Sequence, residues 1–221
     1  MKNKKVDDTI DLLQKPPEVF AGIMPMQRCL YSSRIYLRRL GKLDVAELFK
    51  LYKKNRRYLT KWLQPQPEIL RIDNIIALIK EDQIYARRGQ RLDLGIFDCQ
   101  NDAMLGRIAL HSVDYGIQRS AGVSYWLNEE NAGHGLMTEA LATVVSFAFE
   151  EAALHRIWLN AINQNLASLK LAAKLGFIKE GILRQNLFIN GSWQDSTLFA
   201  LLENEYDKIA DKWIEQHWLG S

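Results

Sequence analysis

The sequence predicts one α/β domain built around a mixed sheet. Segments with apolar residues at helical spacing alternate along the chain with short segments typical of strands. Two turn sequences, residues 100–102 and Asn190–Gly191, separate strand-like segments and indicate hairpins. The predicted order is strand, two helices, three strands, helix, strand, helix, two strands and a final helix. A single mixed sheet flanked by helices is the simplest packing for that order.

The composition is that of a packed protein with no strong charge bias. The chain has 221 residues, of which 48% are hydrophobic and 25% charged, and its net charge is +3. This balance does not indicate a nucleic-acid partner. Cys29 and Cys99 give neither a disulfide framework nor metal-ligand spacing, so we expect a reducing, cytoplasmic compartment and no metal. No apolar run reaches the roughly 18 residues of a membrane span, so we expect no membrane partner.

The chain begins with a segment that we expect to stand apart from the core. Residues 1–30 mix basic, acidic and proline residues and are interpreted as an N-terminal extension, with residues 31–221 forming the main domain. Within residues 32–40, alternation places Ile35 and Leu37 on one face of a first strand.

A helix is expected to follow, with Asp44 as its N-cap and apolar positions through Tyr52. The basic residues 53–57 come next. They fit either a binding patch or a solvated helix end, and the solvated end is the commoner case. Tyr58 and Trp62 could line an acceptor site or fasten this loop to the core. Two prolines, Pro65 and Pro67, end the segment.

A second helix is predicted from Asp73 to Arg88, with Gly89 as its stop. Three strands are predicted after it, at residues 91–98, 103–114 and 122–128.

The central prediction is a glycine turn that opens a long helix over residues 136–151. Apolar residues cover one broad face of this helix, and the positions expected on the other face are Glu139, Thr143, Ser146 and Glu150. Gly133 and Gly135 precede it, where the lack of a Cβ lets a ligand approach the backbone. Unpaired N–H groups and the helix dipole suit a phosphate there, and an ordinary tight turn has the same sequence signature.

The remaining elements complete the sheet. Residues 155–163 form a buried strand, and a helix from Asn165 to Leu175 ends at Gly176. A hairpin turns at Asn190–Gly191. A last amphipathic helix carries apolar residues at helical spacing, namely Ile209, Trp213, Ile214 and Trp218.

Three sequence stretches then carry a resemblance to a known family. They are HGLMTEAL, HRIWLNAINQNLASLKLAAKLGFIKEGILR and INGSWQDSTLFALL. With the element order, they resemble the GNAT superfamily of acetyl-CoA-dependent N-acetyltransferases. The N-x-x-S followed by LGF-x-x-EG, and the NRRYLTKWL stretch, are similar to the Rim-type enzymes that acetylate N-termini of ribosomal proteins. The resemblance covers roughly residues 32–206.

The resemblance implies a GNAT-like fold with two splayed parallel strands, here residues 122–128 and 155–161, that hold acetyl-CoA as cosubstrate. Backbone N–H groups of the turn would bind its pyrophosphate, from the positions Gly133, His134, Gly135, Leu136, Met137 and Thr138. The family pattern begins with Arg or Gln, which is replaced here by Ala132, so a phosphate contact from that side chain is lost. Such backbone contacts depend on geometry and survive the change.

The resemblance also implies catalytic roles for Asn165 and Ser168. The Asn would contact the pantetheine arm and the Ser would hydrogen-bond or protonate the leaving thiolate. From the residues alone, Asn165 is equally a good helix N-cap, and both roles are compatible. Main-chain N–H groups near Trp126 and Leu127 would polarise the acetyl carbonyl.

No general base stands out in the sequence. Glu180 and Arg184 share a strand face and could pair with each other, and Asp195 matches a recurrent family Asp that could be structural. Tyr125 shares a face with two apolar residues, which favours the core. The single histidines have no triad partner in view, and Cys99 fits an inert strand cysteine better than an acyl carrier.

The expected function is therefore acetyl transfer from acetyl-CoA to the α-amino group of a protein, with a ribosomal protein as the candidate acceptor. The amine would attack the thioester directly in a ternary complex. Three alternatives stay open at this point: acetylation of a small amine, an acyl-CoA sensor without turnover, and a ribosome-associated binding module that uses the basic residues 53–57.

Overall fold

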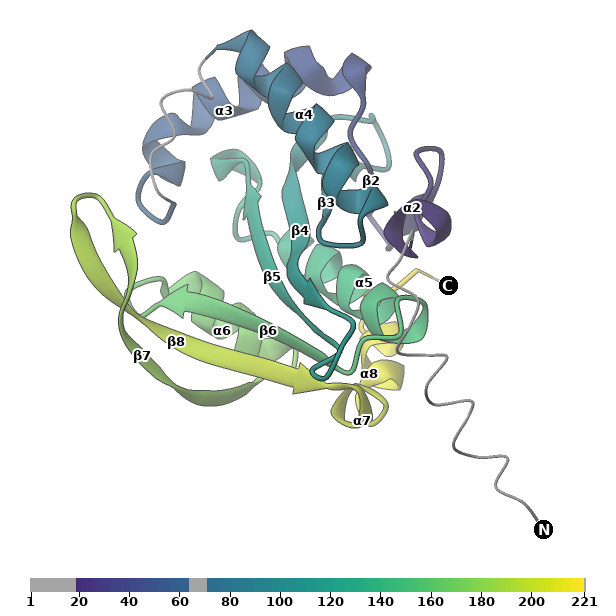
Figure 1. The fold of residues 1–221 in the computed structure, drawn as a ribbon, viewed down its shortest axis with the longest axis vertical. Coiled ribbons are helices and arrows are strands. Elements are labelled where there is room, and N and C mark those ends of the chain that lie inside the picture. The colour runs from purple at the N-terminus through teal and green to yellow at the C-terminus, as the bar shows by residue number, and fades with distance from the viewer. Residues whose placement is uncertain (1–18, 64–70, 221) are drawn as a thin grey trace.

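The protein folds around one curved, eight-stranded mixed sheet, as seen in the computed structural model (Figure 1). The structure describes residues 19–63 and 71–220. The strand order across the sheet is β1-β2-β3-β4-β5-β6-β8-β7. The strands are β1 (Cys29–Tyr31), β2 (Ile35–Arg38), β3 (Leu92–Asp98), β4 (Met104–Asp114), β5 (Ser120–Leu127), β6 (Arg156–Ile162), β7 (Ile178–Ile189) and β8 (Ser192–Leu202). The predicted mixed α/β fold is confirmed.

Helices cover both faces of this sheet. Helices α3 and α4 pack on β3 and β4, and the long central helix α5 packs on the opposite face against β2, β4 and β6 (Figure 1). The α-helices are α2 (Val19–Ile23), α3 (Val45–Leu59), α4 (Ile72–Arg87), α5 (Leu136–Glu150), α6 (Leu166–Lys174), α7 (Glu203–Tyr206) and α8 (Ala210–Glu215). We call the sheet face that α3 and α4 cover the α3–α4 face. None of the described helices is long and apolar enough to cross a membrane.

The sheet opens at its one parallel pair. β5 pairs with β6 only at the start of both strands, where Gly122 lies opposite Trp158. Beyond that point β5 still pairs with β4, and β6 still pairs with β8 over its whole length. The two strands therefore diverge and leave a fork between residues 123–127 and 159–162. This is the arrangement expected for splayed strands.

Most of the central helix is buried, including two of the positions expected on a polar face, while Ser146 is half-buried and Glu150 is exposed. Glu139 and Thr143, expected on a polar face, are 2% and 7% exposed. Glu139 is tolerated there because Ser32 Oγ donates to one carboxylate oxygen at 2.7 Å and Arg34 Nε donates to the other at 2.6 Å. Elements on either side cover the helix, and the helical pattern alone does not reveal this.

The chain enters the core earlier than expected. Phe20 and Met24 are fully buried and Leu30 is nearly so, and all three belong to the main hydrophobic cluster. The described part of the predicted extension thus contributes these three side chains to the core, and it includes β1, a strand that was not predicted. The helix predicted from Asp44 runs on through the basic residues 53–57 to Leu59. The two prolines predicted to end that segment lie outside the described residues.

Candidate active site

The glycine turn before α5 presents a row of free backbone donors. Gly133 and Gly135 have φ values of +82° and +83°, a left-handed conformation that glycine adopts without strain. Thr138 N–H donates to Gly135 O at 2.9 Å. Within the described part of the chain, no protein group accepts a hydrogen bond from the N–H groups of residues 133–137. A Cβ built on Gly133 would meet nothing within 4 Å, so a ligand has room to approach.

A cation that the sequence did not indicate lies beside this turn. Arg34, in the β1–β2 connection, donates to His134 O at 3.0 Å and pairs with Glu139. Half of its side chain stays exposed. Ala132 removes the polar side chain that the family pattern places at the start of the turn, and Arg34 supplies a positive charge close by. These free amides and this guanidinium fit the pyrophosphate of acetyl-CoA.

The start of α6 lies beside the fork. Asn165 is the N-cap of α6, and its Oδ1 accepts from Ser168 N–H at 3.2 Å, so the capping interpretation is confirmed. The cap fixes the first turn of α6 and with it the position of the Ser168 side chain. Ser168 Oγ lies 2.7 Å from the hydroxyl of Tyr125 on β5. These two residues therefore join the fork strand β5 to α6.

Tyr125 is a site residue that sequence reasoning assigned to the core. Its ring does pack against the main hydrophobic cluster, as expected from its alternation with Val123 and Leu127. Its hydroxyl, however, reaches Ser168. Burial raises the pKa of Tyr125 to about 12, and the hydrogen bond between Tyr125 and Ser168 opposes that shift. The phenol is thus neutral at physiological pH and can donate a proton in a hydrogen bond.

The two predicted amide donors of β5 point in different directions. Asn128 N–H donates to Leu105 O of β4 at 2.7 Å. The register between the two strands continues without a break from there, and backbone groups alternate between the two sides of a strand. Trp126 N–H therefore faces β4, while Leu127 N–H faces the fork. Of the two, Leu127 is the donor placed to polarise a carbonyl in the fork.

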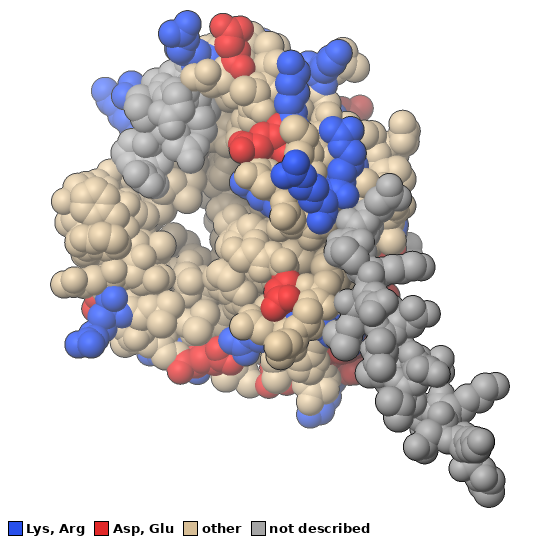
Figure 2. Space-filling view, in the orientation of Figure 1, with Lys and Arg blue, Asp and Glu red and all other residues tan. Residues whose placement is uncertain are grey.

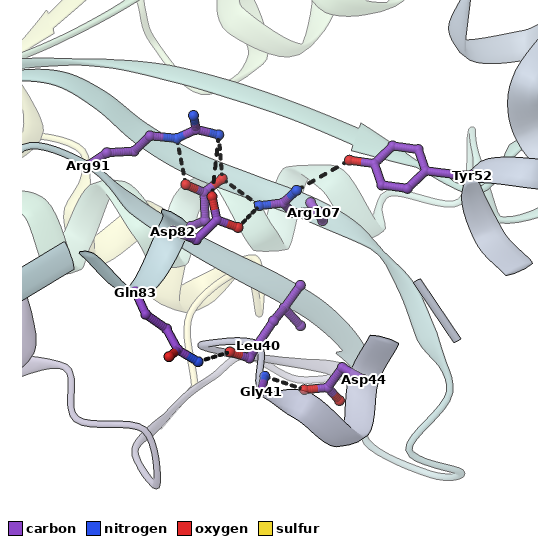
Figure 3. Close-up of polar contacts among 9 residues, drawn as sticks. Leu40, Gly41, Asp44, Tyr52, Asp82, Gln83, Arg91 and Arg107 are labelled. Carbon is purple, nitrogen blue, oxygen red and sulfur yellow. Dashed lines mark hydrogen bonds and ion pairs between the residues drawn. The ribbon is translucent and has the colours of Figure 1, made fainter. Parts of the chain in front are cut away.

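A buried charged cluster joins β3 and β4 to α3 and α4 on the α3–α4 face of the sheet (Figure 3). Arg107 on β4 is 5% exposed. Its Nη2 lies 2.8 Å from Asp93 Oδ1 on β3 and also contacts Asp82 Oδ2 on α4. Arg107 Nη1 donates to the hydroxyl of Tyr52 on α3 at 3.2 Å. The ring of Tyr52 then packs on Trp126, with centroids 4.9 Å apart. Burial raises the pKa of Asp82, and the positive charge of Arg107 opposes this rise.

The remaining candidates take structural roles. Glu180 pairs with Arg156 of β6 and not with Arg184, which corrects the expected pair. Asp195 Oδ1 accepts from Gln185 N–H at 2.8 Å, where β7 departs from regular pairing.

Two other predictions are also resolved by the structure. His111 packs edge-on against Trp158. In α3, Lys54 forms an exposed ion pair with Glu130, as expected for a solvated helix face. In the parts that the structure describes, no group of three or more His, Cys, Asp or Glu side chains could hold a metal ion.

An opening leads into the concave side of the sheet. The space-filling view shows it between the α3–α4 side and the β7–β8 hairpin, and the described atoms around it are mostly those of uncharged residues (Figure 2). The hairpin tip reaches the end of α3, since Asn190 Nδ2 donates to Thr60 O at 2.7 Å.

Comparison with known proteins agrees with this geometry. The chain matches the family model for the acetyltransferase (GNAT) domain over residues 34–178. It is 33% identical over 179 residues to the probable N-acetyltransferase YjcK of Bacillus subtilis, covering 78% of this chain and 96% of that protein. It is 28% identical over 176 residues to the ribosomal protein uS5-alanine N-acetyltransferase of Escherichia coli, covering 78% of this chain and 89% of the relative.

A solved structure shows the same fold. The chain aligns with Mycobacterium smegmatis RimJ in complex with CoA-disulfide at a TM-score of 0.80 and 24% identity, over 86% of this chain and 94% of that one. The family model spans more than half of the chain and includes both arms of the fork and the turn that follows β5. The chain therefore belongs to the GNAT family of acetyl-CoA-dependent N-acetyltransferases.

Proposed function

We propose that this enzyme acetylates the α-amino group of a protein N-terminus, with a ribosomal protein as the acceptor, in the cytoplasm. The observation that supports the acceptor class is the opening on the α3–α4 side, where the described residues are mostly uncharged (Figure 2). A polyamine carries several positive charges and would call for acidic side chains there. The similarity to the Escherichia coli uS5-alanine enzyme supports the same class.

In this proposal, acetyl-CoA supplies the acetyl group and the thiolate that leaves. The free amides of residues 133–137 and the guanidinium of Arg34 hold its pyrophosphate. Leu127 N–H stabilises the negative charge that develops on the acetyl oxygen. Ser168, held by Tyr125, donates a hydrogen bond toward the sulfur as the thiolate leaves. The neutral amine arrives from the α3–α4 face and attacks the carbonyl carbon directly. Its nitrogen then loses a proton to solvent water as the C–S bond breaks and the thiolate leaves.

A peptide-array assay tests the proposal. The purified protein is mixed with acetyl-CoA and peptides that differ in their first residue, and free thiol and peptide mass are followed. We expect thiol release with peptides that begin with Ala or Ser, and acetyl on the N-terminus. Spermidine serves as the comparison acceptor. Faster turnover of spermidine than of every peptide would show that the acceptor is a small amine, and no turnover at all would favour an acyl-CoA sensor.

A further inference from the structure

Asn160, near the end of β6, has a side-chain amide with no partner. Its Oδ1 is buried and accepts no hydrogen bond from any described residue. No described group accepts a hydrogen bond from its Nδ2 either. A buried polar group left unpaired costs about 1–3 kcal/mol, and native proteins rarely keep one without a reason. The residue therefore calls for a role beyond packing.

The position of Asn160 gives the first indication of that role. It lies two residues beyond Trp158, the last residue of β6 to pair with β5, and so it stands where the fork has just opened. A Cβ on Gly122 would lie 2.7 Å from the ring of Trp158, so this ring forms the floor of the fork. Asn160 and Trp158 share a face, because side chains alternate along a strand. The side chain of Asn160 thus lies on β6 next to the ring of Trp158, on the same face of the sheet.

The neighbours of Trp158 show which face this is. Its ring packs edge-on against His111 of β4, at 5.4 Å between centroids. Arg107 is four residues before His111 on the same strand face, and it bonds Tyr52 of α3. Asn160 is therefore on the α3–α4 face, from which the acceptor comes. Tyr125 and Ser168 act from the opposite face.

Other asparagines near this end of the sheet already have partners. Asn163 Oδ1 accepts from Thr197 Oγ1 at 2.8 Å. Asn186 Nδ2 donates to Ser196 Oγ at 2.9 Å. Asn128, at the end of β5, also has a buried Oδ1 without a partner, but its Nδ2 donates to Asn131 Oδ1 at 3.1 Å. Asn160 differs from these three asparagines because neither end of its amide has a partner among the described residues.

An asparagine amide offers one oxygen acceptor and two N–H donors. A peptide group offers the complementary pair, one carbonyl oxygen and one N–H. A simple alkyl amine or a polyamine has no carbonyl beside its amine. We infer that Asn160 binds the first peptide group of the acceptor and so selects peptide N-termini over simple amines. This inference rests on the proposed function and names the residue that would read the acceptor.

The test compares two acceptors that differ at one group. The first is a short peptide with an N-terminal Ala, and the second is the same peptide with its first carbonyl reduced to CH₂. The variant Asn160→Leu keeps a similar volume and removes both polar groups. Asn163→Leu is the matched control, because its amide serves the fold through Thr197. The ratio of variant to wild-type kcat/KM for each acceptor cancels the difference in amine basicity.

We expect Asn160→Leu to lower kcat/KM about tenfold or more on the intact peptide, as the loss of two hydrogen bonds predicts. On the reduced peptide, which lacks the carbonyl but keeps an N–H, the loss should be clearly smaller, and the Kd for acetyl-CoA should be unchanged. The variant should also unfold at no lower urea concentration than the wild type, since it removes an unpaired buried group. The control should lose stability without changing the preference between the two acceptors.

Two other results would overturn the inference. Equal losses on both acceptors, or no loss on either, would leave Asn160 a structural residue while the N-terminal acetylation stands. A wild-type enzyme that ignores the intact peptide would refute the proposed function itself, and the assignment of Asn160 with it.

Discussion

The hydroxyl of Tyr125 lies 2.7 Å from Ser168 Oγ and links the fork strand β5 to the first turn of α6. Burial raises the pKa of Tyr125 to about 12, so the phenol that partners Ser168 stays protonated. The pair can therefore donate toward a developing thiolate without titrating in the physiological range.

Ser168→Ala should lower kcat about ten- to a thousandfold with acetyl-CoA binding nearly intact, because a general acid contributes on the order of 10² or more. Tyr125→Phe keeps the ring and removes the hydroxyl, so it should cause a smaller loss. The double variant should be no slower than Ser168→Ala if Tyr125 acts through Ser168. Steady-state kinetics and calorimetric titration measure these effects. Additive losses would mean that the two hydroxyls act separately.

Gly135→Val should raise the Kd for acetyl-CoA at least about tenfold, or about 1.4 kcal/mol. A side chain at φ +83° strains the turn, and its Cβ would lie 3.2 Å from Arg34 Nη2. Gly191→Val is the matched control, with φ +78° at the hairpin tip and nothing within 4 Å of a Cβ. Both variants should lose stability and only Gly135→Val should lose affinity. Calorimetric titration showing equal affinities would refute the phosphate site.

Arg34→Ala should weaken acetyl-CoA binding by about tenfold, and the effect should shrink as salt concentration rises. Acetyl-pantetheine lacks the pyrophosphate and serves as the matched ligand, whose binding we expect to change little. The variant also removes a partner of buried Glu139, so unfolding must be measured alongside. Equal losses for both ligands would assign Arg34 to the fold alone.

The acceptor preference follows from amine basicity. A lysine with a pKa of about 10.4 is neutral in about one molecule in 2,500 at pH 7, and an α-amine with a pKa of about 7.7–8.0 in about one in ten. Supplying the neutral nucleophile costs about 3 kcal/mol less for an N-terminus. The rate should rise with pH and level off near 8.

Mass spectrometry of a peptide with a free N-terminus and an internal lysine measures that preference. Acetyl appearing first on the lysine would contradict it and point to a base other than Glu180 and Asp195, which have structural partners.

Arg107→Leu should destabilise the protein by about 3–5 kcal/mol, because it leaves Asp82 and Asp93 buried with one cation fewer. Arg156→Ala is the control. It breaks an ion pair with Glu180 whose two side chains are 28% and 35% exposed, and such a pair contributes about 0–1 kcal/mol. Urea unfolding of both variants measures the difference. Similar small losses would show that the cluster in Figure 3 adds little to stability.

The local elements of the site could be predicted from the sequence. The helix expected over residues 136–151 is observed as Leu136–Glu150, and the turn before it has the two left-handed glycines that its sequence indicates. Asn165 caps α6 as expected. These features depend on residues within one or two turns of each other, so propensity, capping and glycine conformation decide them.

The contacts that complete the site could not be predicted in this way. Arg34 meets the glycine turn about a hundred residues later in the chain, and Tyr125 meets Ser168 across 43 residues. The alternation of side chains along β5 correctly placed Tyr125 on the same apolar face as Val123 and Leu127. It could not show that α6 docks at the end of that side chain. Nor could it show that β1 and β2 would bury Glu139.

The sequence by itself thus determined the order of the elements from β2 to β8, the glycine turn before α5 and the family. The tertiary structure alone decided where the fork opens and which side chains line its two faces. The physical reason is that hydrogen bonds within one element follow local spacing. The pairing of Tyr125 with Ser168, and the lack of a partner at Asn160, arise only when distant elements pack together.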